Sequence, residues 1–319
     1  MFKKLILALV CLSFTLNSSA AKLTATLQSG DKVTPFYGVN AFVEAYNAAV
    51  NGDVITLSPG EFKVTDIEKS ITVIGTYAFS DDLSKATQFS ASITVSGDNV
   101  TLEGIRFVGA MCIKGTDNLT INRCNIHTLN NEAKTEHRYH VNTILTDCCI
   151  SMFNAMSLSQ NAVLRNCSIN YFLKLNESGN LALIENCNIS SFTSSRPCAI
   201  YRNCLLGLHN GGNGSYIVEF YAPNEFHNNC FYDISYSSCT LRFESAVRNN
   251  NIHKHAYSSG GVIYPANGSF IPYTQDGVSY GPADHKAYPA IPSITSSEID
   301  TKTDAEGNLH VKITATARD

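Results

Sequence analysis

The chain has 319 residues, of which 44% are hydrophobic and only 16% are charged, and its formal net charge is −4. This composition excludes a disordered chain and, because there is no basic excess, it excludes a nucleic-acid-binding domain. Trp is absent, but 15 Tyr and 16 Phe accompany many Asn, Ser and Thr residues. Such a composition is typical of short strands and tight turns.

The first element in chain order is a predicted secretory signal peptide over residues 1–20. Two lysines precede an apolar run from Leu5 to Leu16, and small residues follow, so we expect cleavage near Ala20 or Ala21. The run is too short to span a bilayer, and no later stretch supplies a transmembrane segment. We therefore expect an exported protein that is secreted, periplasmic or at the cell surface.

A short helix is predicted next, because apolar residues recur at helical spacing between Val39 and Ala49. Two segments that alternate like strands follow it, GDVITLSPGEFKV and IEKSITVIGT. We expect the helix to cap one end of a larger strand assembly, over about residues 36–50.

One eight-residue pattern then recurs: an apolar-x-apolar strand, two polar residues and a second strand of the same kind. Six copies place a cysteine directly after the polar pair, namely Cys124, Cys148, Cys167, Cys187, Cys204 and Cys230. Ile105 and Asn250 take this place in two flanking copies, and the steps between the eight positions are 19, 24, 19, 20, 17, 26 and 20 residues. This spacing predicts a solenoid with loops of variable length.

The residue before each of these positions is expected to form a sharp corner in the left-handed conformation, which Gly, Asn and Asp tolerate best. These residues are Gly104, Arg123, Asp147, Asn166, Asn186, Asn203, Asn229 and Asn249. We expect their amides to hydrogen-bond from rung to rung, with Asn122 replacing Arg123 in this role.

The cysteines fall on one inward column, about 4.8 Å apart with parallel side chains, which does not bring Cβ atoms to the roughly 3.8 Å of a disulfide. We therefore expect free, buried thiols rather than disulfides or a zinc site, which needs convergent ligands. A leucine-rich repeat is the alternative solenoid, but the leucine expected three places before the first strand position does not recur, and the intervening segments are not helical.

The helix followed by G-D-x-I-x-L-x-x-G-x-[FY] and I-x-K-x-I-T-V-I-G resembles the start of pectate-lyase-like β-helix proteins, including chondroitinase B and alginate lyase relatives. The likeness covers about Val39–Gly75, and the ladder extends it to about residue 265. It implies an all-β, single-stranded right-handed parallel β-helix over residues 21–288. Residues 289–319 are expected to form a linker and a terminal strand that covers the other end.

In proteins of the resembled fold, saccharide lies along the outer face of one parallel sheet. We expect this sheet on the segments after each variable loop, with Lys114, His140, Lys174, Glu219 and Arg242 pointing outward. Lys174, Arg242 and His140 are the candidate catalytic residues, since β-elimination needs a base, an acid and neutralisation of the uronate carboxylate. Lys114, Glu219, Arg138 and Tyr216 are the candidate substrate-binding residues.

The catalytic motifs of the family are not matched. The chondroitinase-like Lys-Ser and Arg-His-Gly are absent, because Leu175 follows Lys174 and Phe243 follows Arg242. The same face is also explained by solvated side chains, with Glu219 and Arg242 as an ordinary cross-strand ion pair. No cofactor is expected, and calcium at Asp81, Asp82 or Asp117 has weak support.

These observations predict an exported β-helix protein that binds polysaccharide or another surface glycan, leaning towards a non-enzyme. A polysaccharide lyase acting on uronate-containing glycans is the first alternative, and a structural or adhesive surface protein is the second. We expect a monomer that binds no nucleic acid.

Overall fold

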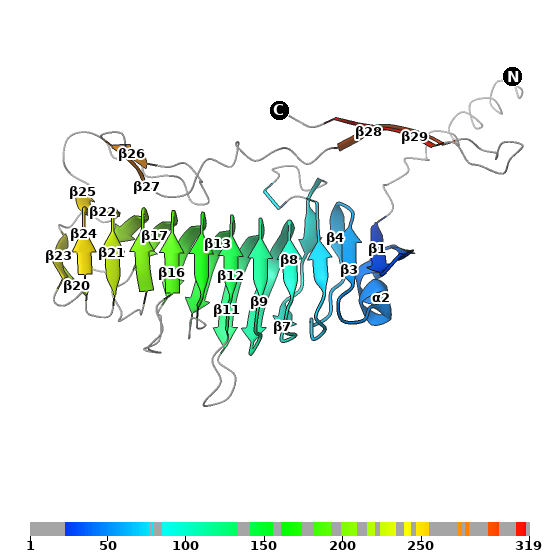
Figure 1. The fold of residues 1–319 in the computed structure, drawn as a ribbon, viewed down its shortest axis with the longest axis horizontal. Coiled ribbons are helices and arrows are strands. Elements are labelled where there is room, and N and C mark those ends of the chain that lie inside the picture. The colour runs from blue at the N-terminus through cyan, green and yellow to red at the C-terminus, as the bar shows by residue number, and fades with distance from the viewer. Residues whose placement is uncertain are drawn as a thin grey trace, which may run out of the picture.

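The chain folds as an all-β parallel β-helix with a helix at its N-terminal end, as the sequence predicts (Figure 1). The computed structural model describes the backbone of residues 23–76, 78–79, 85–132, 141–155, 161–173, 182–192, 199–208, 216–220, 224–233, 239–243, 247–254, 273–275, 278–280, 293–299 and 311–316. The predicted signal peptide lies outside these residues.

Two long sheets run the length of the β-helix. The 12-stranded sheet begins with the antiparallel hairpin of β2 (Lys32–Tyr37) and β1 (Thr24–Ser29), and β1 is antiparallel to β3 (Val54–Leu57). Parallel strands then follow in the order β5 (Thr72–Ile74), β8 (Thr101–Glu103), β10 (Thr120–Asn122), β12 (Ile144–Thr146), β14 (Val163–Arg165), β16 (Ala182–Glu185), β18 (Ala199–Arg202), β21 (Glu225–His227) and β24 (Val247–Asn249).

The 11-stranded sheet is parallel throughout and supplies the second strand of each rung. Its members are β4 (Gly60–Phe62), β6 (Thr87–Phe89), β7 (Ile93–Val95), β9 (Ile105–Lys114), β11 (Asn125–Glu132), β13 (Cys149–Ala155), β15 (Ser168–Leu173), β17 (Asn188–Phe192), β19 (Leu205–Leu208), β22 (Cys230–Asp233) and β25 (Ile252–Lys254). The register between β9 and β11 shifts between Ile126 and Thr128, so each long strand continues past an irregularity into a further segment of sheet.

The corner between the two sheets is a single residue in the left-handed conformation, as the sequence predicts. φ lies between 52° and 65° at Gly104, Arg123, Asp147, Asn166, Asn186 and Asn203. The corner N–H donates to a carbonyl of the next rung, for example from Asn166 to Glu185 O at 3.1 Å. Arg123 takes this conformation although it is neither Gly, Asn nor Asp.

The last two corners lie one residue away from the predicted positions. The left-handed residues are Asn228 and Asn250, with φ of 54° and 51°, rather than Asn229 and Asn249. The register agrees, because Leu205 rather than Cys204 pairs with Cys230. Asn229 and then Asn251 therefore occupy the place that cysteine holds in the preceding rungs.

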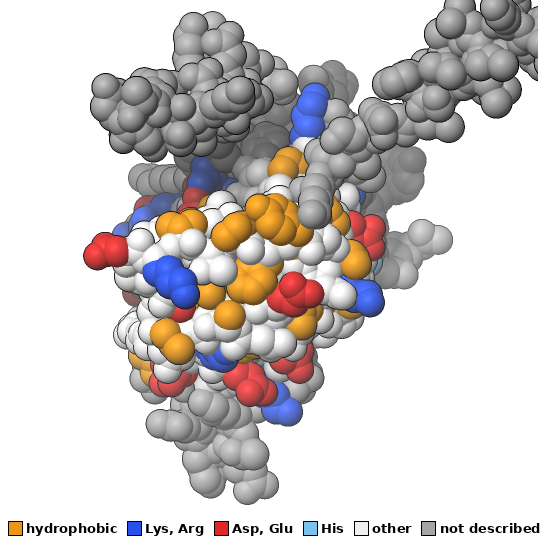
Figure 2. All heavy atoms as spheres, turned by 90° about the vertical axis from the view of Figure 1, so that its right-hand side faces the viewer, with side chains coloured by type: hydrophobic (Ala, Val, Ile, Leu, Met, Phe, Trp, Pro, Cys, Tyr) orange, Lys and Arg blue, Asp and Glu red, His pale blue; other side chains and the backbone are white. Residues whose placement is uncertain are grey.

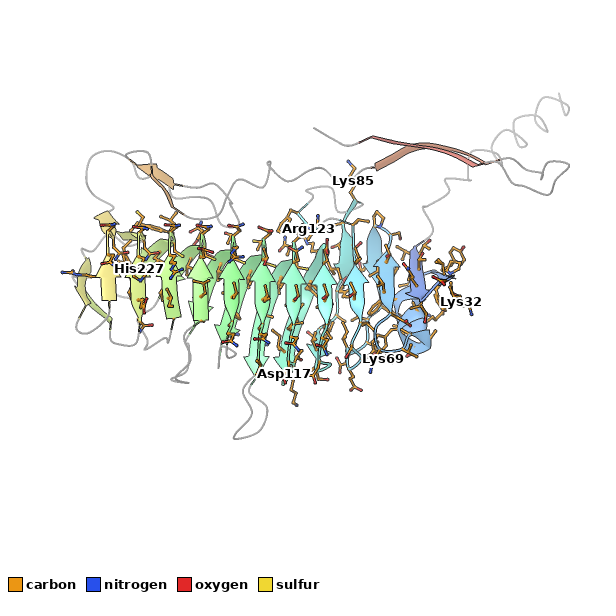
Figure 3. The ribbon with its side chains drawn as sticks, viewed as in Figure 1. Lys32, Lys69, Lys85, Asp117, Arg123 and His227 are labelled. Atoms are coloured by element: carbon orange, nitrogen blue, oxygen red, sulfur yellow. The ribbon has the colours of Figure 1, made fainter. Side chains whose placement is uncertain are left out.

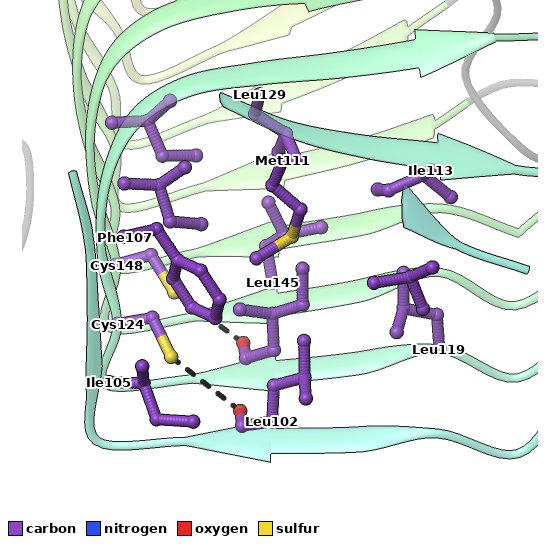
Figure 4. Close-up of a cluster of buried hydrophobic side chains, with 14 of the residues drawn as sticks. Leu102, Ile105, Phe107, Met111, Ile113, Leu119, Cys124, Leu129, Leu145 and Cys148 are labelled. Atoms are coloured by element: carbon purple, nitrogen blue, oxygen red, sulfur yellow. Dashed lines mark hydrogen bonds between the residues drawn. The ribbon is translucent and has the colours of Figure 1, made fainter. Parts of the chain in front are cut away.

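The inward column of thiols runs from Cys124 to Cys204, and the eight cysteines whose side chains the structure describes are free. Each Sγ in the column donates to the carbonyl of a buried residue one rung earlier, over 3.3 to 3.7 Å, as Figure 4 shows for Cys124 and Leu102. Asn229 Nδ2 donates in the same way to Tyr201 O at 3.0 Å, and Asn251 Nδ2 donates to Phe226 O at 2.8 Å. The amide thus takes over the donor role of the thiol at the C-terminal end.

A second corner, which the sequence analysis did not identify, carries the ladder of amide–amide hydrogen bonds. Asn99, Asn118, Asn142 and Asn161 all have φ between 56° and 60°. Nδ2 of each of the last three donates to Oδ1 of the one before it, over 2.8 to 3.1 Å. The predicted ladder of stacked amides therefore exists, but at the corner that precedes the 12-stranded sheet.

The core is a stack of equivalent apolar positions from successive strands. One lane of the 12-stranded sheet contributes Leu102, Ile121, Leu145, Leu164, Ile184, Tyr201 and Phe226. Arg248 follows Phe226 in this lane and is exposed, so the core ends on a charged residue. Sequence position within the rung, rather than loop length, decides which side chain is buried.

The N-terminal end is closed by the predicted helix, α2 (Ala41–Ala48). Phe42 of α2 packs against Phe89 of the first rungs with ring centroids 4.9 Å apart. Lys69 lies at the end of the helix (Figure 3), and its Nζ donates to the carbonyls of Tyr46, Asn47 and Ala49 over 2.7 to 3.3 Å. Tyr46 O also accepts from Ala49 N at 3.2 Å. A cation at this place adds a charged donor to the carbonyls at the helix C-terminus and complements the helix dipole.

Replacing Lys69 by Met is expected to lower the free energy of unfolding by about 1–2 kcal/mol, because these carbonyls lose a charged donor. Urea unfolding followed by circular dichroism measures the change. Lys63→Met is the matched control, since Lys63 is exposed, and it should change stability by less than about 0.5 kcal/mol. Equal effects of the two substitutions would contradict the capping role.

The edge strand β2 exposes apolar side chains at this end of the molecule (Figure 2), among them Val33 at 60% and Tyr37 at 51%. Gly38 N donates to Leu23 O, and in the antiparallel register Pro35 is opposite Thr26, where backbone groups of β2 point away from β1. Proline has no N–H to offer there, which disfavours the addition of another strand.

The C-terminal region contains a strand pair rather than one terminal strand. β28 (Ser293–Ile299) pairs antiparallel with β29 (Val311–Thr316) in a sheet of their own. β26 (Tyr273–Gln275) and β27 (Val278–Tyr280) form another antiparallel pair. The strands of these two pairs bond to each other and extend neither of the long sheets.

Candidate functional site

An outward-facing row of side chains lies on the further segments of β9, β11 and β13, and we call it the Lys114 face. Thr94 of β7 is in register with Cys112, Cys112 with Asn130, and Asn130 with Asn154. Their neighbours Met111, Leu129 and Phe153 are buried, so strand alternation turns the polar row outward. Lys114 lies two residues beyond Cys112 and is exposed.

The two asparagines of this face are hydrogen-bonded to each other. Asn154 Nδ2 donates to Asn130 Oδ1 at 2.8 Å. This bond fixes the orientation of both amides, leaving an amide donor on Asn130 and a carbonyl acceptor on Asn154 for other partners. The face therefore presents a fixed donor and a fixed acceptor beside a mobile cation.

The neighbour of Lys114 in the next rung is Glu132, and the predicted row with His140 beside it was wrong. The reason is that β11 runs without interruption from the corner to Glu132, so this sheet segment begins before the variable loop. His140 itself lies outside the described residues, as do Arg138, Lys174, Asp81 and Asp82.

The other predicted residues lie further along the chain, on a parallel pair of strands, β20 (Tyr216–Phe220) and β23 (Cys239–Phe243). Glu219 is in register with Arg242, which is the adjacent-rung arrangement that the sequence predicts. Tyr216 is in register with Cys239. The backbone brings Glu219 and Arg242 together, whereas Lys114 belongs to earlier rungs.

A second outer face, on the 12-stranded sheet, was not identified from the sequence. Its strands are short, so the first and third residues of each point outward in two lanes. The apolar lane consists of Ile144, Val163, Leu183 and Ile200. The polar lane consists of Thr146, Arg165, Glu185, Arg202, His227 and Asn249.

Several members of the polar lane are paired within the chain. Arg165 Nε donates to Glu185 Oε2 at 3.0 Å, and Arg123 pairs with Glu103 nearer the N-terminus. His227, seen in Figure 3 near the C-terminal end of the sheet, lies 3.0 Å from Glu225 through Nε2 and 3.1 Å from Asn249 Nδ2 through Nδ1. Arg202 is exposed and forms no such pair within the part of the chain that the structure describes.

A sequence signal for this face exists, because each short strand ends on a polar residue after an apolar-x-apolar start. The segments VLR, LIE and IYR, at residues 163–165, 183–185 and 200–202, show it directly. The sequence analysis treated that residue only as part of the polar pair at the corner. Its place on a continuous outer face depends on the pairing between rungs.

The thiols are not arranged for chemistry. Burial raises the pKa of Cys124, Cys148, Cys167 and Cys187 well above the ordinary value, and neighbouring thiols raise it further. Cys149, on the outer side of β13, has its pKa raised by burial to about 11. Thiols that stay protonated are poor nucleophiles and poor metal ligands.

Within the described residues, no three His, Cys, Asp or Glu side chains converge in a way that would hold a metal ion. No helix in the same part of the chain is long and apolar enough to cross a membrane. Asp117 accepts a hydrogen bond from Val141 N at 3.0 Å, and its own N–H donates to Asp98 at 2.9 Å. These bonds give Asp117 a structural role at the second corner.

Neither a family model, nor a curated protein, nor a solved structure matches this chain.

Proposed function

We propose that this protein is an exported β-helix that binds a polysaccharide or another surface glycan along the Lys114 face, without cleaving it. The observation that carries the proposal is the outward polar row of Thr94, Cys112, Asn130 and Asn154 in register across four rungs, beside the exposed Lys114. A polysaccharide is itself a linear repeat of hydroxyl groups, which such a row matches.

The chemistry of the row supports binding of a polar polymer. The Asn154–Asn130 hydrogen bond holds both amides in place before a ligand arrives, so little conformational entropy is lost on binding. Lys114 is a flexible cation with three donors, suited to hydroxyl or carboxylate oxygens at slightly different positions. Recognition would therefore be tolerant of the sugar and dependent on its acidic groups.

Export is supported by the apolar N-terminal run, and the buried cysteines are compatible with it. An oxidising compartment favours disulfides between accessible thiols. The column from Cys124 to Cys204 is buried, with thiols donating to backbone carbonyls. Such thiols are protected from oxidation in the folded protein.

The absence of cleavage is proposed because the lyase motifs are not matched around Lys174 and Arg242. Incubating the mature protein with a panel of uronate polymers tests this part directly. A rise in ultraviolet absorbance from unsaturated uronate would establish the lyase alternative and overturn the non-catalytic proposal. In that case Lys174→Ala and Arg242→Ala are the variants to compare.

Binding is tested on a glycan array, followed by titration of the best ligand. Lys114→Glu is expected to weaken binding of an acidic glycan at least about tenfold, or about 1.4 kcal/mol, because a cation is replaced by an anion. Lys63→Glu is the matched control for net charge, and it should bind like the unmodified protein. Absence of any glycan binding, or equal loss in both variants, would contradict this site and favour the structural or adhesive alternative.

A further inference from the structure

The outer face of the 12-stranded sheet has a charge order that is complementary to itself. Along the polar lane Arg165 is followed by Glu185, then by Arg202, and then by His227, which is bonded to Glu225. Reversing the lane about the midpoint between β16 and β18 places Glu185 opposite Arg202. The same reversal places Arg165 opposite His227, whose bonded partner Glu225 lies opposite Val163 in the neighbouring lane.

The apolar lane beside it has the same property. Reversal about this midpoint places Leu183 opposite Ile200, so the aliphatic side chains nearest the centre meet one another. Ile144, 37% exposed, extends this lane towards the N-terminus. Burying aliphatic surface of this kind is favourable, and the lane itself offers a sugar few hydrogen-bonding groups.

We propose that two copies of this chain pack together through this face, with a two-fold axis that runs along the strands between β16 and β18. Arg202 pairs with Glu185 of the partner subunit, and Leu183 packs on Ile200 of the partner subunit. Each contact occurs twice, as a two-fold interface requires. The arrangement is that of two sheets stacked face to face with nearly aligned strands.

Charge pairing favours a second copy over an acidic or basic partner. The lane alternates in sign instead of presenting one charge, so a uniformly charged polymer would meet repulsion at every second rung. Arg202 is exposed and forms no ion pair with another described residue, whereas Arg165 Nε donates to Oε2 of Glu185. Oε1 of Glu185 is thus left to accept from Arg202 of the partner subunit.

The proposal departs from the monomer expected from the sequence, and sedimentation of the mature protein over a range of concentrations tests it. A reversible dimer is expected. Arg202→Glu and Glu185→Arg should each weaken the dimer at least about tenfold, and the double variant should recover it, because the charges are exchanged rather than lost. Circular dichroism checks that each variant is folded.

Two further variants test whether dimer formation depends on the proposed contact. Leu183→Glu should weaken the dimer, whereas Thr101→Glu, on the same face but outside the contact, should not. A protein that is monomeric at every concentration, or a dimer that Arg202→Glu and Leu183→Glu leave unchanged, would overturn the proposal. Lys114→Glu should dimerise normally, so failure here is distinct from failure of glycan binding.

Discussion

Raising the pH from about 8.5 to about 9.5 is expected to lower the free energy of unfolding by roughly 5 kcal/mol. In the folded protein, burial raises the pKa of Cys124, Cys148, Cys167 and Cys187 well above the ordinary value, and it raises the pKa of Cys149 to about 11. Below pH ~8.5 these thiols are protonated in both states, so stability does not depend on them. Above that pH the unfolded chain loses protons that the folded chain keeps, and unfolding becomes easier by about 1 kcal/mol per thiol over this interval.

The measurement is a series of urea unfolding curves between pH 7 and about 9.5, with a reductant present to prevent disulfide formation after unfolding. The double variant Cys167→Ala, Cys187→Ala should lose only roughly 3 kcal/mol over the same interval, because two of the five responsible thiols are gone. Tyr and Lys side chains, which titrate at higher pH, are common to both proteins. The same pH dependence in both would show that the thiols are not its source.

Phe226→Ala is expected to lower the free energy of unfolding by about 3–5 kcal/mol. Phe226 is fully buried and stacks on Tyr201 with centroids 4.8 Å apart and an interplanar angle of 3°, and it also contacts Phe231 at 5.7 Å. Removing the ring leaves a cavity near the end of the core, and the stacking contribution of about 0.5–1.5 kcal/mol is lost with it.

The same urea assay measures this loss. Phe226→Leu retains most of the volume and should cost clearly less than alanine, whereas Val108→Ala, at a side chain 45% exposed, should stay within about 0.5 kcal/mol. If alanine at Phe226 costs no more than alanine at Val108, the stack is not the packing unit at this end of the β-helix.

Most of the fold could be predicted because the repeat places an apolar residue, a corner and a thiol at fixed offsets. The corner at Asn166 and the inward position of Cys167 follow from these offsets alone. The prediction was wrong where the sequence has Asn228-Asn229-Cys230, because cysteine was aligned with cysteine. In the structure, Asn229 occupies the position of the inward cysteine and supplies the buried donor. Cys230 lies one residue further along, on the outer side of the sheet.

The candidate site could be predicted less well. Lys114 was predicted to be exposed, and Glu219 was predicted to be adjacent to Arg242, since both depend on local alternation. The neighbour of Lys114 could not be predicted, because an irregularity between Ile126 and Thr128 changes how far each long strand extends. The faces of the β-helix are set by pairing between rungs, which sequence spacing describes only where loops are short.

The two ends of the β-helix are closed differently, so they should resist a pulling force differently. A force that pulls the chain apart separates one rung at a time, because each strand pairs with the strands of adjacent rungs. The C-terminal rung has Arg248 and Asn251 where earlier rungs have apolar residues and thiols, while α2 and Lys69 close the other end. Among the described rungs, unwinding under load is therefore expected to begin at β24 and to proceed towards the helix, with the extension rising in steps of one rung.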